Sequence, residues 1–223
     1  MASKPMTLSL ADVRRLLNDA GIDPKKSLGQ NFVIDPNTVR RIARLSRVGP
    51  ESRVVEIGAG LGSLTLALIE TGARVTAIET DKALIPILTD LVGDHAEIIE
   101  ADVRNLKWDE TLPNPGWNLV ANLPYNIATS IVLTVLDEVP SIDRMLVMVQ
   151  REAGERLVAP VGNAAYGAVS VRVALRANAS VVGQVPPSVF YPRPRVTSAL
   201  VAIERVDHGI ESEVETELIE LLR

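Results

Sequence analysis

The sequence predicts an α/β protein with a Rossmann-like fold, in which a mostly parallel sheet carries helices on both faces. Two observations support this prediction. Short β-branched runs alternate with helix-like segments along the 223 residues, and such alternation is typical of a parallel sheet. The stretch from Arg53 to Thr65 joins one of these runs to three glycines and a helix start. This is the first half of a nucleotide-binding βαβ unit.

Gly58, Gly60 and Gly62 lie between that predicted strand and helix. Because glycine has no side chain, the backbone of such a loop can approach a ligand closely, and the helix start beyond it offers free N–H groups. Glu79 ends the next predicted strand, where this fold places the carboxylate that accepts hydrogen bonds from ribose hydroxyls. The spacing G-x-G-x-G resembles the first motif of S-adenosylmethionine-dependent methyltransferases. A tight turn in an unrelated α/β protein and a nicotinamide-dependent oxidoreductase are the alternatives.

Composition indicates an intracellular protein with a hydrophobic core of its own. Hydrophobic residues make up 47% of the chain, and cysteine is absent, which excludes disulfides and thiolate metal sites. Apolar runs are too short to cross a membrane, the N-terminus lacks a signal-peptide core, and no cluster has metal-ligand spacing. We therefore expect a cytoplasmic protein without a metal site, built on one α/β domain and a small addition.

Charge is distributed unevenly along the chain. The net charge is −5, but residues 1–48 carry +5, residues 49–150 carry −9, residues 151–203 carry +4 and residues 204–223 carry −5. Two basic segments therefore flank an acidic nucleotide-binding half. If they meet in space, they form a phosphate-binding face. An ordinary solvated surface is the alternative.

The remaining elements follow from periodicity and capping signals. The predicted helices cover Ser9–Ala20, Asn37–Arg47, a segment beginning at Leu64, Lys82–Val92, Thr129–Leu136 and Glu152–Val158. The predicted strands begin with the run at Arg53 and continue with Arg74–Glu79, Glu97–Asp102, Trp117–Ala121, Arg144–Gln150, Ala179–Val185 and Ser198–Ile203. Ser9 is a candidate N-cap. Pro86 must lie in the first turn of its helix or kink it.

Asp102 ends the third predicted strand. The carboxyl ends of the strands line the ligand crevice of a doubly wound sheet. We therefore expect the Asp102 carboxylate to accept a hydrogen bond from the adenine amino group of a nucleoside cofactor, beside the ribose site at Glu79. A solvated carboxylate at a strand end is the alternative for either residue.

The tetrapeptide Asn122-Leu123-Pro124-Tyr125 follows the fourth predicted strand and faces the same crevice. It resembles the N/D-P-P-Y motif of enzymes that methylate exocyclic amino groups of bases. Such an amine is a poor nucleophile because its lone pair is delocalised, and two acceptors, Asn122 Oδ1 and the Leu123 carbonyl, would draw it toward tetrahedral geometry. Pro124 stiffens the turn, and Tyr125 can stack on an extruded base. A strand-end turn with a packed tyrosine is the alternative.

The segment from Phe190 to Ser198 is basic and aromatic, and its prolines hold it extended. We expect Phe190 to cover the other face of the base. Arg193 and Arg195 are expected to contact phosphates. A proline-rich loop around a buried phenylalanine is the alternative.

Four motifs occur together along the chain. They are Lys26-Ser27-Leu28-Gly29-Gln30-Asn31-Phe32, Glu56-Ile57-Gly58-Ala59-Gly60, Asn122-Leu123-Pro124-Tyr125-Asn126 and Phe190-x-Pro192-x-Pro194-Arg195-Val196-x-Ser198. Together they resemble the ribosomal RNA adenine N6,N6-dimethyltransferase family over about residues 25–205. Leu123 and the lead-in from Lys26 favour its small-subunit branch over the macrolide-resistance branch. Val33 and Ala59 depart conservatively from the usual leucine and proline.

The resemblance implies a class I methyltransferase fold of seven strands, one of them antiparallel. It implies transfer of methyl groups from S-adenosyl-L-methionine to two adjacent adenines near the 3′ end of small-subunit ribosomal RNA. The expected cofactor contacts are Asn31, Val33, Gly58, Gly60, Glu79, Asp102 and Asn122. The expected catalytic residues are Asn122, Leu123, Pro124, Tyr125 and Phe190, and the expected RNA contacts are Lys25, Lys26, Arg193 and Arg195. A macrolide-resistance-type enzyme and a non-catalytic ribosome-assembly factor on the same fold are the alternatives.

Residues 1–205, including the basic segment 1–48, are expected to form the catalytic domain. In residues 206–223, Ile210, Val214 and Leu218 fall at helical spacing among acidic residues, and the apolar side of such a helix needs a partner. Because family members continue into a small helical domain, we expect these residues to begin a truncated one. The expected partner is the assembling small ribosomal subunit, and the expected state is a monomer without membrane contact.

Overall fold

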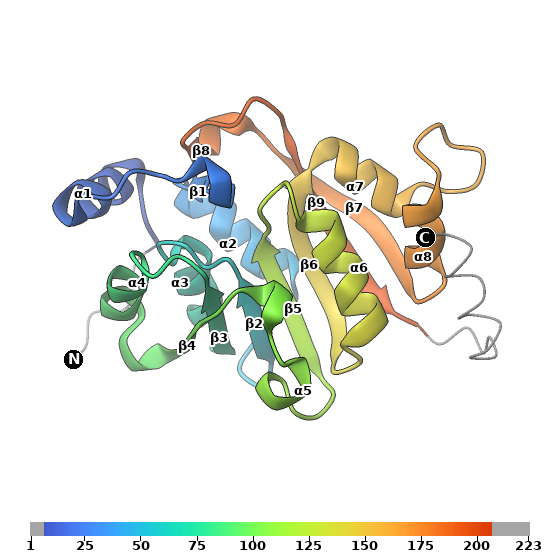
Figure 1. Ribbon diagram of the computed structural model, residues 1–223, viewed down its shortest axis with the longest axis horizontal. Helices are drawn as coiled ribbons and strands as arrows, with labels where there is room; N and C mark the ends of the chain where they lie inside the picture. Colours follow the sequence, from blue (N-terminus) through green and yellow to red (C-terminus); the bar gives the residue numbers. More distant parts are fainter. Residues whose placement is uncertain (1–6, 207–223) are drawn as a thin grey trace.

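The computed structural model describes residues 7–206, apart from the side chain of Lys26. Its centre is a seven-stranded sheet with the order β4-β3-β2-β5-β6-β9-β7 (Figure 1). The strands are β2 (Arg53–Ile57), β3 (Arg74–Glu79), β4 (Ala96–Glu100), β5 (Trp117–Asn122), β6 (Ile142–Gln150), β7 (Ala177–Val185) and β9 (Ser198–Arg205). Within this sheet β9 alone runs against the others, since it pairs antiparallel with both β6 and β7. The prediction of a mostly parallel sheet with one antiparallel strand is confirmed.

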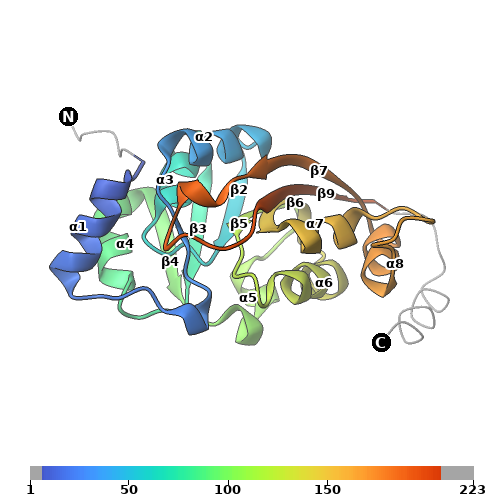
Figure 2. The same ribbon diagram turned by 90° about the horizontal axis from the view of Figure 1, so that it is seen from above.

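Helices cover both faces of the sheet (Figure 2). One face carries α1 (Leu10–Ala20), α2 (Pro36–Leu45), α3 (Ser63–Ile69) and α4 (Ile85–Val92). The other face carries α6 (Ala128–Glu138), α7 (Arg151–Val158) and α8 (Ala168–Ala174). Successive strand residues alternate between these layers, so that Val54 packs with α2 and α3 while Val55 packs with α6. This arrangement brings the carboxyl ends of β2, β3 and β5 to one edge, where ligands bind in such folds.

The two basic segments of the chain meet at this edge. Strand β1 (Phe32–Val33) comes from the first segment and pairs antiparallel with β8 (Phe190–Tyr191) of the second. The Arg14 guanidinium lies 5.3 Å from the centre of the Tyr191 ring, and Arg41 Nη1 donates to the carbonyl of Gln184 at 3.1 Å. A phosphate-binding face was expected only if the two basic segments meet in space, and the structure shows that they do.

Several boundaries differ from the predicted ones. Helix α4 begins at Ile85 rather than Lys82, so that Pro86 lies in its first turn and no kink is required. Strand β4 ends at Glu100, and Asp102 instead caps the short 3-10 turn Val103–Asn105 through a hydrogen bond to the Arg104 amide. The β1–β8 pair and α5 (Trp108–Thr111) were not predicted, because each is too short to give a periodic pattern. Helix α8 was not predicted either; its sequence AVSVRVA is rich in β-branched valine, which favours strands over helices.

The predicted helix around Ile210 lies outside the described residues, so it stays a prediction, as does the domain boundary at residue 205. Between residues 7 and 206, no helix is long and apolar enough to cross a membrane. The same part of the chain holds no cluster of three or more His, Asp or Glu side chains that could bind a metal ion.

Candidate active site

The glycine loop between β2 and α3 forms the floor of the site. Gly58 and Gly60 have φ angles of 73° and 59°, in the left-handed region that favours glycine. A Cβ at Gly60 would lie 3.1 Å from the Phe32 ring, whereas one at Gly58 would make ordinary contacts, 3.8 Å from Pro124 and 4.0 Å from the Asn122 carbonyl. The motif therefore uses glycine both for its turn and to keep the floor of the hollow clear.

Glu79 at the end of β3 is 5% exposed and holds the glycine loop in place. Its Oε2 accepts from the Gly60 amide at 2.7 Å, and its Oε1 accepts from the amides of Thr80 and Asp81 at 2.9 and 2.8 Å. Burial raises the pKa of Glu79, and these three backbone hydrogen bonds counteract the rise. The Glu79 carboxylate thus lies where a ribose acceptor was expected. It also accepts hydrogen bonds from the backbone of the glycine loop and of the following turn, which the sequence did not indicate.

Glu56 lies behind the glycine loop and is 2% exposed. Burial raises the pKa of Glu56 to about 8; the nearby Thr65 hydroxyl opposes the rise and the Glu79 carboxylate adds to it. Among the described residues, neither Glu56 Oε2 nor the hydroxyl of Ser63 has a hydrogen-bond partner. Since buried polar groups are nearly always paired, these two atoms could pair with a polar ligand in the hollow that Glu56 and Ser63 line, which is described below.

Asn122 ends β5 and faces the loop that precedes β1. Its Nδ2 donates to the Asn31 carbonyl at 3.0 Å, so that Oδ1 is left as the acceptor. The next residue, Leu123, is 1% exposed and its amide donates to Met148 of β6 at 3.1 Å. The sheet therefore fixes the peptide that carries both predicted acceptors, as positioning of an amine requires.

Tyr125 is half-buried, and its hydroxyl lies 2.7 Å from the hydroxyl of Ser198. Ser198 begins β9 and is fully buried. Burial raises the pKa of Tyr125, although the hydrogen bond to Ser198 opposes the rise. Two motifs that lie far apart in the sequence thus meet, and the second one fixes the position of the tyrosine ring of the first.

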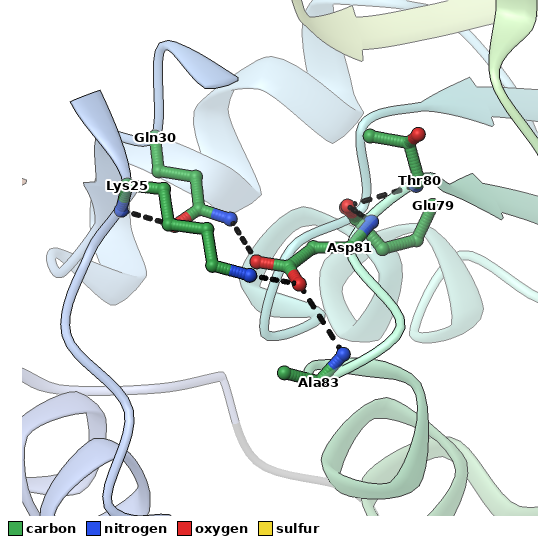
Figure 3. Close-up of polar contacts among 6 residues, drawn as sticks. All are labelled: Lys25, Gln30, Glu79, Thr80, Asp81 and Ala83. Carbon is green, nitrogen blue, oxygen red and sulfur yellow. Dashed lines mark hydrogen bonds and ion pairs between the residues drawn. The ribbon is translucent and has the colours of Figure 1, made fainter. Parts of the chain in front are cut away.

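The loop from Lys25 to Asn31 closes the site from the side of β3. Lys25 Nζ lies 2.6 Å from Asp81 Oδ1, and Gln30 Nε2 donates to Asp81 Oδ2 at 2.8 Å (Figure 3). Gln30 Oε1 in turn accepts from the Lys25 amide at 2.7 Å. At the other end of the loop, Asn31 is held by Asn122. This loop therefore spans the space between the ends of β3 and β5.

Two hollows lie under this loop. The first, about 80 Å³, is lined by Asn31, Val33, Gly58, Gly60, Glu79 and Asn122 among others. The second, about 140 Å³, is lined by Asp102 with Ile78, Asn126 and others. Leu28, Gly58, Thr80 and Pro124 line both hollows. The structure thus brings all seven predicted cofactor residues around one pair of adjoining hollows.

Asp102 keeps its place at the second hollow although it lies beyond the strand. Its Oδ2 accepts from Arg104 Nη2 at 2.6 Å, and Oδ1 caps the Arg104 amide at 3.0 Å. These hydrogen bonds hold the pKa of Asp102 below its ordinary value. The residue is therefore an ionised acceptor, as an adenine amino group would need, and Arg104 was not predicted beside it.

Phe190 does not support its predicted role. The side chain is 2% exposed and packs in the core with Val39, Val185 and Leu200. A ring that covers a base needs an exposed face, and the Phe190 ring has none. The structure therefore shows the alternative, a buried phenylalanine. Phe190 supports Val33 across the β1–β8 pair instead.

The predicted RNA contacts divide into two kinds. Arg193 and Arg195 are exposed, and neither forms an ion pair with the described residues. Lys25 differs from these two, because its ammonium is paired with the buried Asp81, and its contact with RNA stays a prediction. The backbone of Lys26 opens a 3-10 turn, Lys26–Leu28, and its side chain lies outside the described part of the chain.

Sequence reasoning missed Asp81, Gln30 and Ser198 as parts of the site. Gln30 and Ser198 lie inside two of the identified motifs, and this position was the only sequence signal for a role in the site. Their partners, Asp81 and Tyr125, could not be deduced from the sequence. Asp81 follows Glu79 by two residues, and nothing local distinguishes it from a solvated loop acid. Another hollow, about 330 Å³, lies at the opposite edge of the sheet beside Arg44, Arg47 and Arg144, away from all these residues.

Comparison with known proteins places this arrangement among RNA methyltransferases. The model of a family described as ribosomal RNA adenine dimethylase matches residues 22–222. Ribosomal RNA small subunit methyltransferase A of Thermobifida fusca is 49% identical over 203 residues, covering 89% of this chain and 71% of its own. The protein of that name from Kineococcus radiotolerans is 50% identical over 205 residues, covering 89% of this chain and 67% of its own.

Two solved structures have similar folds. A dimethyladenosine transferase from Plasmodium falciparum superposes with a TM-score of 0.74 at 26% identity, over 85% of this chain and 68% of that one. The 23S rRNA methyltransferase ErmE has the same score and identity, over 86% of this chain and 77% of that one.

Proposed function

Because the chain belongs to the ribosomal RNA adenine dimethylase family, we propose that it methylates the N6 amino groups of two adjacent adenines near the 3′ end of small-subunit ribosomal RNA, with S-adenosyl-L-methionine as methyl donor. The observation that carries the proposal is the tie between Asn122 and Asn31, which orients an amide oxygen at the mouth of a glycine-floored hollow. The relatives at 49% and 50% identity are named for the small subunit, which favours that substrate over the large subunit.

The residues around the two hollows fit this cofactor. The orphaned Glu56 Oε2 and Ser63 hydroxyl offer hydrogen bonds to its charged amino acid portion. Glu79 lines the first hollow for the ribose, and Asp102 lines the second for the adenine. When bound, S-adenosylmethionine supplies an electrophilic methyl group on a sulfonium sulfur.

The chain's own part in the reaction is positioning. Asn122 Oδ1 and the Leu123 carbonyl accept the two amino hydrogens of the target adenine and turn its lone pair out of conjugation. Tyr125, held by Ser198, stacks on the extruded base. Pre-organised acceptors of this kind need no rearrangement during the reaction. No side chain is required as a base, because the methylated ammonium is acidic enough to release its proton to water.

RNA phosphates are proposed to contact the face where the two basic segments meet. Arg193 and Arg195 lie exposed after β8, and Arg41 lies exposed on α2, where it contacts Gln184 of the second basic segment. Exposed arginines that form no ion pair within residues 7–206 attract a polyanion. Lys25 is left out of this set because Asp81 neutralises it. A monomeric state and a cytoplasmic location stay predictions.

The test incubates the chain with labelled S-adenosylmethionine and with small or large ribosomal subunits that lack these methyl groups, and reads the modified nucleosides by mass spectrometry. Dimethyladenosine in small-subunit RNA is the expected product. Methylation of large-subunit RNA alone would support the macrolide-resistance alternative. Binding to small subunits without any methyl transfer would support the assembly factor.

A further inference from the structure

We propose that Asp81 is a positioning residue that holds the loop of residues 25–31 shut over the cofactor pocket, and thereby sets how fast the cofactor leaves. The identity of the ligand, S-adenosylmethionine, comes from the proposed function, and the inference rests on the proposed function for this point. We call the contacts among Lys25, Gln30 and Asp81 the clasp.

The clasp is a closed set of short contacts. Both carboxylate oxygens of Asp81 are used, one by Lys25 Nζ at 2.6 Å and the other by Gln30 Nε2 at 2.8 Å (Figure 3). Asp81 Oδ1 also accepts from the Ala83 amide at 3.2 Å, which ties it to the turn before α4. Gln30 Oε1 and the Lys25 amide close the ring at 2.7 Å. The side chains of Lys25 and Gln30 thus both meet at Asp81, in the turn that precedes α4.

Burial makes these contacts strong. The Asp81 side chain is 3% exposed, whereas that of Lys25 is 46% exposed. Burial acts to raise the pKa of Asp81, but the hydrogen bonds from Lys25 and Gln30 prevail and lower it. A buried carboxylate in this state is an anion whose loss of partners is costly.

The clasp also reaches the predicted ribose acceptor. The Asp81 amide donates to Glu79 Oε1 at 2.8 Å, while Glu79 Oε2 holds the Gly60 amide at 2.7 Å. A continuous path of hydrogen bonds therefore joins Gln30 on the loop to the glycine floor. A change at Asp81 acts on both sides of the pocket.

The loop restricts the space that is open to a ligand. Neither hollow, at about 80 and 140 Å³, reaches the roughly 300 Å³ of the smallest usual ligand pockets. Leu28 of the loop and Pro124 lie between them, since both residues line both hollows. A Cβ at Gly29 would lie only 3.1 Å from Pro124 Cβ, so the closed loop rests directly on the Asn122–Tyr125 motif. Opening the clasp frees the end of the loop that Asn122 does not hold.

The test exchanges donor and acceptor across the clasp. Asp81→Asn places an amide donor against the Gln30 amide, and Gln30→Glu places a second carboxylate against Asp81, so each single change breaks the contact. The double variant Asp81→Asn with Gln30→Glu restores it with the polarity reversed and the total charge retained. Dissociation of S-adenosylmethionine is measured by stopped-flow chase, and hydrogen exchange of the amides of residues 27–31 is measured without cofactor. Glu100→Gln, which removes the exposed Lys82–Glu100 pair, is the matched control.

We expect each single variant to release S-adenosylmethionine at least about tenfold faster and to exchange the loop amides faster. The double variant should return both toward the parent values, and the control should match the parent. Single variants that behave like the parent, or a double variant no better than either single, would overturn the inference. If the parent chain itself does not bind S-adenosylmethionine, the proposed function fails, while the exchange rates still decide whether Asp81 holds the loop.

Discussion

The side-chain amide of Asn122 donates to the backbone carbonyl of Asn31 at 3.0 Å, across 91 residues of sequence. This one bond joins the end of a central strand to the loop that covers the site. It fixes the amide orientation, because Nδ2 is committed to Asn31 and only Oδ1 is left for the target amine. In the proposed function, the same contact would both close the pocket and present the acceptor.

Asn122→Ala should lower kcat on small subunits by on the order of 100-fold, as loss of one pre-organised polar group does in other active sites. Cofactor affinity should fall less, because the glycine floor and Glu79 are kept. The control is Asn118→Ala at the other end of β5, which removes a 3.3 Å bond to the Arg53 carbonyl. Single-turnover kinetics measure the effect, and a kcat within twofold of the parent would contradict the role of Asn122.

Glu79→Gln should weaken S-adenosylmethionine binding by about ten- to a hundredfold, because hydrogen bonds to a charged group contribute about 1.5–3 kcal/mol. Glu79→Ala should in addition lower the melting temperature, since the amides of Gly60, Thr80 and Asp81 lose their acceptor. Calorimetry measures the affinity of both variants. Glu97→Gln on the neighbouring strand is the control. An intact fold with unchanged affinity would remove Glu79 from the cofactor site.

Tyr125→Ala should lower turnover on RNA by at least about tenfold, since stacking on a base contributes roughly 1–3 kcal/mol. Cofactor affinity should stay nearly unchanged, as Tyr125 lines neither hollow. Tyr125→Phe and Ser198→Ala each break the 2.7 Å hydroxyl contact but keep the ring, and they should show smaller losses. A collapse of cofactor binding with normal turnover at saturation would place Tyr125 in the cofactor pocket instead.

Glu56 should make stability depend on pH. Its pKa is raised from 4.5 to about 8 in the fold, so the folded chain binds a proton there that the unfolded chain lacks between those values. The stabilisation of the folded chain by this protonated Glu56 is fully present below pH 4.5 and is lost as pH rises toward 8. Glu56→Gln should therefore gain stability relative to the parent across this window, by up to roughly a few kcal/mol at one pKa unit per about 1.4 kcal/mol. Urea unfolding from pH 5 to 9 measures this, and parallel curves for the two proteins would contradict it.

Arg193→Glu with Arg195→Glu should weaken binding to small subunits and flatten its salt dependence. Each phosphate contact contributes roughly 0.7–0.9 to the slope of log affinity against log salt, so the slope should fall by about 1 to 2. Arg74→Glu, exposed at the start of β3, is the control at the opposite edge of the sheet. Filter binding from 50 to 300 mM salt measures the slope. An unchanged slope would show that these arginines do not contact phosphates.

Local features were readable from the sequence alone. Strand β3 has the predicted bounds, and β2 begins at Arg53 as predicted, because runs of β-branched residues fit a buried, pleated strand. The glycine loop could be predicted for a similarly local reason. Gly58 and Gly60 have positive φ angles, which favour glycine whatever the rest of the fold does. Ser9 caps α1 and Gly21 ends it, as the local capping rules predict.

The sequence alone thus determined the sheet, the glycine floor and the identity of the residues around it. Tertiary structure decided what each polar group is paired with. The Lys25 ammonium pairs with Asp81 in the clasp, Phe190 packs in the core, and the Ser198 hydroxyl contacts that of Tyr125. Propensity and periodicity act over one helix turn or one strand, whereas these pairings join residues 56 or more positions apart. They exist only where the fold brings two such segments together and removes the water between them.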